Sequence, residues 1–213
     1  MWVQGCSIGC AGCFNSHMWP RDGGRVVDVE ELAARVVQTS GIEGVTFLGG
    51  EPFEQANALG ELGGRVRAHG LSVLTFSGYG YDHLVDSARE DWIRLLSATD
   101  LLIDGPYDRT QPDVQRPWVG SRNQSFRFLT SRYLHLRSRL GAIHDRVEVR
   151  ISSDGRTFIN GMCSQDFLHS VRKDLRRESG AESNRRLYER GRSKRVPTLA
   201  PSSLHTADPA ERY

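Results

Sequence analysis

Three cysteines near the start of the chain carry the strongest chemical signal in the sequence. Cys6, Cys10 and Cys13 lie in one short segment. Thiols spaced so closely are poorly placed for a disulfide framework and well placed to hold a metal ion or an iron–sulfur cluster in a reducing compartment. Such clusters are held by cysteine thiolates, usually one for each iron, so three cysteines would leave one iron of a 4Fe-4S cluster without a protein ligand. Interleaved glycines give the backbone freedom to approach the inorganic sulfurs: Gly5, Gly9 and Gly12.

Two other uses of these cysteines remain open at this point. His17 follows Cys13 closely and could complete a Cys3His tetrahedron around structural zinc. Alternatively, Cys163 could bind the fourth iron, which would give an electron carrier without chemistry of its own. Cys163 is equally consistent with a small, inert side chain.

The residues after the cysteine segment predict repeated strand–helix units. Asp28–Thr39 is expected to form a helix in which Asp28 and Glu31 make a capping box. Strands are expected to end at Gly49, Phe76 and Ile103, each before a glycine-containing break. Repeated βα units imply a parallel sheet whose functional residues gather at the carboxyl ends of the strands. The predicted fold class is therefore α/β.

The remaining elements follow from hydrophobic periodicity and turn signals. We expect strands at Val45–Leu48, Leu71–Phe76 and Leu101–Ile103, helices at Gln55–Ala68, around Leu84 and at Trp92–Leu96, a hairpin of Val147–Ile151 with Thr157–Ile159 around Asp154-Gly155, and a last helix over Gln165–Arg177.

The chain is expected to be one domain over residues 1–177 followed by a basic tail over 178–213. The formal net charge is only +2, yet most of the basic residues between 171 and 195 lack an acidic neighbour, and this stretch runs into Pro197, Pro201 and Pro209. Disorder is the expected state of the tail. Nucleic-acid binding is the sharper alternative, but neither interleaved aromatic residues nor a recognisable module favours it.

The sequence gives no indication of a membrane or secretory segment. No apolar run approaches the roughly 18 residues that a membrane-spanning helix needs. Met1 is followed by neither a basic n-region nor an apolar h-region. We therefore expect a cytoplasmic protein.

Two segments resemble the radical S-adenosylmethionine activating enzymes, above all those of anaerobic ribonucleotide reductase and pyruvate formate-lyase. The first runs from Trp2-Val3-Gln4-Gly5-Cys6 through Cys13-Phe14-Asn15, and the second is Gly49-Gly50-Glu51-Pro52, which is similar to the family's Gly-Gly-Glu element. Further similar elements are Ser77-Gly78-Tyr79, Asp104-Gly105-Pro106-Tyr107 and Gly120-Ser121-Arg122-Asn123-Gln124.

The resemblance implies a partial β/α barrel that cleaves S-adenosylmethionine reductively to methionine and a 5'-deoxyadenosyl radical. It implies that the three cysteines ligate a 4Fe-4S cluster and that Gly49, Gly50 and Glu51 orient S-adenosylmethionine. Glycines at a strand end would admit the ligand, and the carboxylate would meet its ammonium with a charge-assisted hydrogen bond. Candidates for its ribose or adenine side are Ser77, Gly78 and Asp104.

The resemblance also implies a partner. A chain with little room for a lid favours a large substrate that closes the site itself, such as a glycyl radical enzyme. The expected electron donor is flavodoxin or ferredoxin. Radical modification of another peptide or small molecule remains open, as does a zinc-stabilised binding module that uses the basic tail.

The chain departs from the family in two places. Only five residues precede Cys6, where such enzymes usually carry a first strand, so we expect either a late-assigned start codon or a missing sheet edge. Met162-Cys163 matches no catalytic element, so no role is assigned to it.

Overall fold

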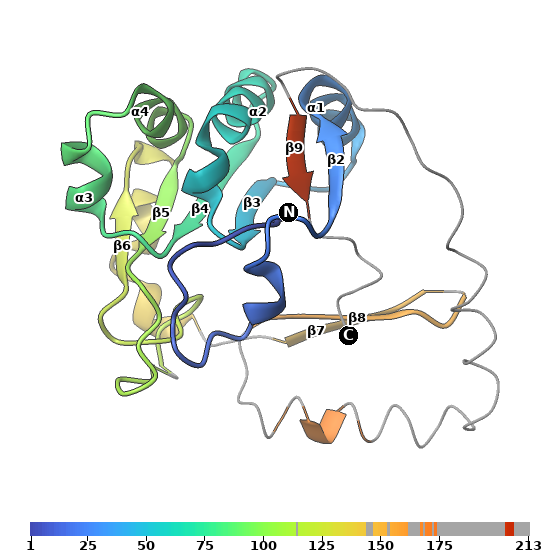
Figure 1. Ribbon diagram of the computed structural model, residues 1–213, viewed down its shortest axis with the longest axis vertical. Coiled ribbons are helices and arrows are strands. Elements are labelled where there is room, and N and C mark those ends of the chain that lie inside the picture. The colour runs from blue at the N-terminus through green and yellow to red at the C-terminus, as the bar shows by residue number, and fades with distance from the viewer. Residues whose placement is uncertain are drawn as a thin grey trace.

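The computed structural model describes residues 1–113, 115–143, 147–152, 154–161, 167, 169–171, 173 and 203–206 (Figure 1). The helices are α1 (Val29–Gln38), α2 (Ala56–Ala68), α3 (Tyr81–Asp86) and α4 (Glu90–Ser97). The strands are β1 (Trp2–Val3), β2 (Arg25–Asp28), β3 (Gly44–Gly49), β4 (Ser72–Ser77), β5 (Leu101–Asp104), β6 (Ser125–Phe128), β7 (Val147–Ile151), β8 (Thr157–Gly161) and β9 (Ser203–Thr206). Short 3-10 turns are η1 (Ser16–Met18), η2 (Pro52–Gln55), η3 (Ser131–Leu136) and η4 (Leu140–Ala142).

The parallel core of the sheet confirms the predicted βα units. Seven strands form one sheet in the order β2-β9-β1-β3-β4-β5-β6, in which β1, β3, β4 and β5 are successive parallel neighbours. Ser77 at the end of β4 lies opposite Asp104 at the end of β5. The carboxyl ends of β4 and β5 therefore lie side by side, as expected for βα units.

The helices pack in a row along the sheet, with α2 in contact with both α1 and α4 (Figure 1). In α2, which confirms most of the helix expected over Gln55–Ala68, the side chains of Leu59, Leu62 and Val66 are fully buried. Burying each such side chain stabilises the fold by about 1.5–3 kcal/mol. At the start of α1 the side chain of Asp28 accepts a 3.0 Å hydrogen bond from the backbone N–H of Glu31, which confirms the predicted cap.

Four strands of the sheet were not predicted: β1, β2, β6 and β9. β6 adds to β5 as an antiparallel strand, and β9 lies antiparallel between β2 and β1. β9 belongs to the segment expected to be disordered, so that expectation does not hold for Ser203–Thr206; the rest of 178–213 lies outside the described residues. The residues before Cys6 do supply a strand, because β1 pairs with β3.

The predicted hairpin is confirmed by the antiparallel pairing of β7 with β8. Its turn contains Gly155, whose φ of +82° is a left-handed value that glycine adopts readily. Of the helix expected over 165–177, residues 167, 169–171 and 173 are described, and all are helical. Cys163 lies outside the described residues. Within the described part of the chain, no helix has the length and apolar character needed to span a membrane.

Candidate functional site

The loop that carries the cysteines has left-handed backbone at the glycine before each of them. The φ angles are +97° at Gly5, +66° at Gly9 and +82° at Gly12. Residues other than glycine are strained at such positive φ angles, so the path of the loop requires glycine at these positions. This finding supports the expectation that the glycines shape the loop around a ligand.

Hydrogen bonds close the base of this loop. The backbone N–H of Gly5 donates to the carbonyl of Met18 at 2.8 Å, and that of Cys6 donates to Trp19 at 3.1 Å. The side chain of Gln4 donates to the carbonyl of Pro20 at 2.7 Å. These hydrogen bonds therefore join residues 4–6 to residues 18–20, which are the two ends of the loop.

The three thiols are free and partly buried. Burial raises the pKa of the Cys6 and Cys10 thiols, and the backbone N–H of Asn15 lies 3.4 Å from Cys13 Sγ. Among the described residues, no three His, Cys, Asp or Glu side chains form a group that could hold one metal ion, and His17 is exposed. In a 4Fe-4S cluster each thiolate would bind a different iron, so the three thiols would not need to converge on one point.

The cysteine loop lies against the carboxyl ends of the parallel strands (Figure 1). A Cβ on Gly78, at the end of β4, would lie 2.6 Å from Cδ1 of Ile8, which stands between the first two cysteines. A Cβ on Gly12 would lie 3.7 Å from the ring of Tyr107 and 3.5 Å from the side chain of Arg109. The loop therefore contacts both the end of β4 and the segment after β5.

The Gly49-Gly50 pair makes room for backbone. A Cβ on Gly49 would lie 2.6 Å from the backbone N and O of Val3, and a Cβ on Gly50 would overlap the carbonyl of Gly5. The N–H groups of Gly50 and Glu51 donate to these same two residues, Val3 at 2.7 Å and Gly5 at 2.8 Å. These glycines thus hold the entry to the cysteine loop against β3, a use different from the expected admission of a ligand.

The Glu51 carboxylate ties the end of β3 to the end of β4. Glu51 is 1% exposed. Its Oε1 atom accepts hydrogen bonds from the backbone N–H of Phe53 at 2.9 Å and from the hydroxyl of Ser77 at 3.0 Å. Its Oε2 atom accepts a hydrogen bond from the backbone N–H of Gly78 at 2.8 Å. Burial raises the pKa of Glu51 from its ordinary 4.5 to about 7, although the three hydrogen bonds oppose that rise. The structure thus joins three of the expected site residues in one cluster.

The raised pKa of Glu51 predicts a pH-dependent stability. Between pH 4.5 and about 7 the folded protein keeps a proton that the unfolded chain has lost, so the free energy of unfolding should fall as pH rises. Glu51 alone would contribute a fall on the order of 3 kcal/mol across this window. Urea unfolding of the metal-free protein at pH 5 and pH 7 should show this slope, and Glu51→Gln should remove most of it. Exposed Glu61→Gln in α2 is the matched control, and an equal slope in all three proteins would contradict the assignment.

Asp104 lies beside this cluster on β5. Its side chain is 4% exposed and accepts hydrogen bonds from the backbone N–H of Tyr81 at 2.8 Å and from the guanidinium of Arg127 at 2.9 Å. Asp104 lies opposite Ser77 where β5 pairs with β4, but its hydrogen bonds are to residues of α3 and β6. The expected site residues therefore share one edge of the sheet, with Asp104 held separately.

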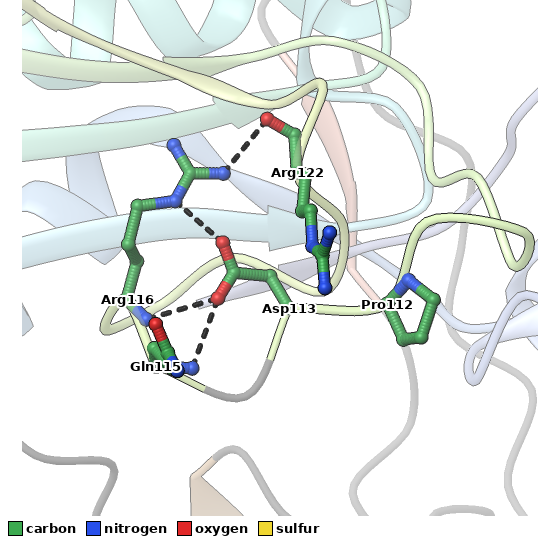
Figure 2. A pocket seen from close by; sticks show the side chains of 5 residues that line it. All are labelled: Pro112, Asp113, Gln115, Arg116 and Arg122. Carbon is green, nitrogen blue, oxygen red and sulfur yellow. Dashed lines mark hydrogen bonds and ion pairs between the residues drawn. The ribbon is translucent and has the colours of Figure 1, made fainter.

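A polar loop over residues 105–124 forms the neighbouring wall of the site. Figure 2 shows Arg116 reaching from the carboxylate of Asp113 to the carbonyl of Arg122, around a surface hollow that these residues line with Pro112 and Gln115. Although burial opposes it, Arg116 and two backbone N–H groups hold the pKa of Asp113 at about 2, so this ion pair persists over the physiological range.

This polar loop is tied to the segment that faces the cysteines. Gln124 donates to the carbonyl of Gly105 at 3.1 Å, and Asn123 donates to that of Pro106 at 2.7 Å. Burial raises the pKa of the Cys10 thiol, and the backbone of Tyr107, the residue after Pro106, opposes that rise. The polar loop is therefore connected to a segment that lies near a cysteine sulfur.

Two residues of η2 contact the cysteine loop and were missed by the sequence analysis. Gln55 donates to the carbonyl of Gln4 at 2.7 Å, and the carboxylate of Glu54 accepts hydrogen bonds from Ser7. The available signal is a pair of polar side chains that follow Phe53 after Gly-Gly-Glu-Pro. The sequence pattern places Gln55 at the start of the expected helix and gives Glu54 no role.

The comparisons with known proteins agree with this geometry. Residues 1–127 match the family described as 4Fe-4S single cluster domain. Similar proteins occur in Enterobacteria phage T4 (29% identity over 58% of this chain and 79% of the relative), Haemophilus influenzae (30%, 58% and 83%) and Escherichia coli strain K12 (27%, 58% and 83%). Each of these relatives is named an anaerobic ribonucleoside-triphosphate reductase-activating protein. The chain therefore belongs to the 4Fe-4S single cluster domain family and to the family of these activating proteins.

Proposed function

We propose that this protein binds a 4Fe-4S cluster through Cys6, Cys10 and Cys13 and, with S-adenosylmethionine, activates an anaerobic ribonucleotide reductase. The observation that carries the proposal is the set of three free thiols on a glycine-shaped loop against the carboxyl ends of β4 and β5. Family membership supports it. The parallel core β1-β3-β4-β5 with helices in a row is compatible with the partial β/α barrel implied by the resemblance.

When bound, a reduced cluster would supply one electron to the sulfonium of S-adenosylmethionine, whose C–S bond breaks to give methionine and a 5'-deoxyadenosyl radical that takes a hydrogen atom from the substrate. The protein's task is positioning. The loop glycines direct the thiols, and the backbone N–H of Asn15 faces the sulfur of Cys13. Hydrogen bonds to cluster sulfurs tune the reduction potential.

The edge beside the cysteine loop is our proposed site for S-adenosylmethionine. Gly49, Gly50 and Gly78 are partly exposed there and could offer backbone groups to the ligand. Glu51, Ser77 and Asp104 are buried and hydrogen-bonded within the protein. We propose that these three residues fix the strand ends at this edge of the sheet. In this proposal Glu51 binds the amino group of S-adenosylmethionine only if it exchanges one of its present hydrogen-bond donors for that group.

The proposed partner supplies a glycine whose Cα hydrogen is abstracted, leaving a glycyl radical and 5'-deoxyadenosine. The names of the relatives point to an anaerobic ribonucleotide reductase as that partner. A reduced flavodoxin or ferredoxin would provide the electron. Hydrogen abstraction needs close approach of the two carbons, so a glycine loop that enters the site would both position the hydrogen and exclude water.

We predict that the reduced protein forms 5'-deoxyadenosine slowly alone and faster with an anaerobic ribonucleotide reductase, because the radical otherwise lacks a good hydrogen donor. Electron paramagnetic resonance of the mixture should show a carbon-centred doublet. Its splitting should collapse when the partner's glycine is deuterated at the α-carbon. A Cys13→Ala protein is the matched control and should give neither signal.

Two outcomes would redirect the proposal. Cleavage of S-adenosylmethionine without a glycyl signal in any candidate reductase would favour radical modification of another peptide or a small molecule. Stoichiometric zinc without sulfide in anaerobically prepared protein would favour the zinc-stabilised binding module.

A further inference from the structure

Glu54 reaches from η2 into the cysteine loop. Its side chain is 9% exposed. One carboxylate oxygen, Oε1, accepts hydrogen bonds from both the backbone N–H and the hydroxyl of Ser7, each at 2.6 Å. The other oxygen, Oε2, accepts from the guanidinium of Arg21 at 2.6 Å. One carboxylate therefore joins Ser7, between the first two cysteines, to Arg21, beyond the third.

The contact with Ser7 is the one that bears on the thiols. Ser7 directly follows Cys6, so its backbone N–H belongs to the segment between the first two cysteines. Arg21 is 74% exposed, and ion pairs with such exposed side chains contribute little. Hydrogen bonds from a backbone N–H and a hydroxyl to a largely buried carboxylate are charge-assisted and stronger.

The charge on Glu54 is maintained by these same donors. Partial burial alone would raise the pKa of Glu54, but the two hydrogen bonds from Ser7 and the contact with Arg21 lower it below its ordinary value. The carboxylate is therefore an acceptor throughout the neutral range.

We infer that Glu54 is a positioning residue for the cluster: it fixes the backbone between Cys6 and Cys10 so that both thiols are oriented before the cluster binds. The neighbouring contacts from η2 hold only the entry to the loop, where Gln55 binds Gln4. Glu54 bonds beyond Cys6, at Ser7. The inference depends on cluster binding and not on the radical chemistry proposed above.

The first test uses metal-free protein and hydrogen exchange. Loss of a charge-assisted hydrogen bond should raise the exchange rate of the Ser7 amide by on the order of tenfold or more in Glu54→Ala. Glu54→Gln keeps one acceptor oxygen and should show a smaller rise. Glu61→Ala, which breaks an exposed ion pair with Arg65 in α2, is the matched control and should leave this amide unchanged.

The second test measures iron release from reconstituted protein under an iron chelator. Release should be on the order of tenfold faster in Glu54→Ala and less accelerated in Ser7→Ala, which retains the backbone N–H donor. The urea midpoint of the metal-free protein should stay within the range of the Glu61→Ala control. Unchanged exchange at Ser7, or unchanged iron release in both variants, would overturn the inference.

A third outcome separates positioning from general stability. If Glu54→Ala does not fold, Ser7→Ala and Glu54→Gln still remove part of the same contact and carry the test. Equal loss of protection in α2 and at Ser7 would make Glu54 a residue of the fold and contradict the positioning role. None of these measurements uses S-adenosylmethionine or a partner, so failure here leaves the proposed function standing, and failure of the radical chemistry leaves this inference standing.

Discussion

Replacing Cys6, Cys10 or Cys13 by alanine is expected to abolish cluster binding. Each thiolate would hold a separate iron, so two remaining cysteines cannot retain a cuboidal cluster. After anaerobic reconstitution the unmodified protein should contain about four irons and four sulfides per chain, and each variant should contain almost none. Circular dichroism of the metal-free variants should match the unmodified protein, which separates loss of a ligand from loss of the fold.

Cys163→Ala is the matched control for these three variants and should keep its iron and sulfide. Loss of the cluster in Cys163→Ala would instead identify that residue as the fourth ligand and favour an electron carrier. Retention of iron and sulfide in Cys6→Ala, Cys10→Ala or Cys13→Ala would contradict the assignment of that cysteine.

Gly50→Ala is expected to lower the stability of the protein strongly. The new methyl group would overlap the carbonyl of Gly5, and the backbone there cannot move freely because the N–H groups of Gly50 and Glu51 hold this segment. Overpacking of this kind costs about 3 kcal/mol when the neighbouring atoms are backbone. The urea midpoint of the metal-free protein should therefore fall, and less iron should be retained after reconstitution.

Gly64→Ala provides a control of opposite sign. Gly64 is exposed in α2, and a Cβ there would have no neighbour within 4 Å. Alanine is favoured over glycine within a helix by about 1 kcal/mol, so this variant should be more stable than the unmodified protein. If both variants change the midpoint in the same direction, the close approach of Gly5 to Gly50 does not limit the fold.

The βα core was predictable because its signals are local. The capping of α1 by Asp28 and the buried face of Leu59, Leu62 and Val66 follow from spacing within one helix. The hairpin turn at Gly155 follows from a two-residue signal. Each of these features depends on residues that are close together in the sequence.

The missed strands depend on pairing between distant residues. β6 has an alternating pattern, with Phe126 and Phe128 two residues apart, but its partner β5 precedes it by a long polar loop. β2 pairs with β9, in which His205 lies opposite Val26. No local pattern in either segment specifies that partner.

The site was predictable in its ligands and less so in its supports. The cysteine spacing and the interleaved glycines indicated the loop directly, and the left-handed φ angles agree with that interpretation. The close approach of Gly50 to Gly5 and the hydrogen bonds of Glu54 to Ser7 join separate segments. Such contacts depend on tertiary packing, which residue types alone do not reveal.

The position of β9 bears on the order in which the protein matures. β9 fills the place in the sheet between β1 and β2, the strands on either side of the cysteine loop, and pairs Thr206 with both Val3 and Arg25. A ribosome makes the chain from its N-terminus at about 5–20 residues per second, so the loop emerges long before this strand. Contacts across such sequence separations also form slowly, since loop closure must come first. Insertion of a cluster into a loop whose two flanking strands are already paired with β9 therefore follows synthesis of β9, although the cysteines are made much earlier.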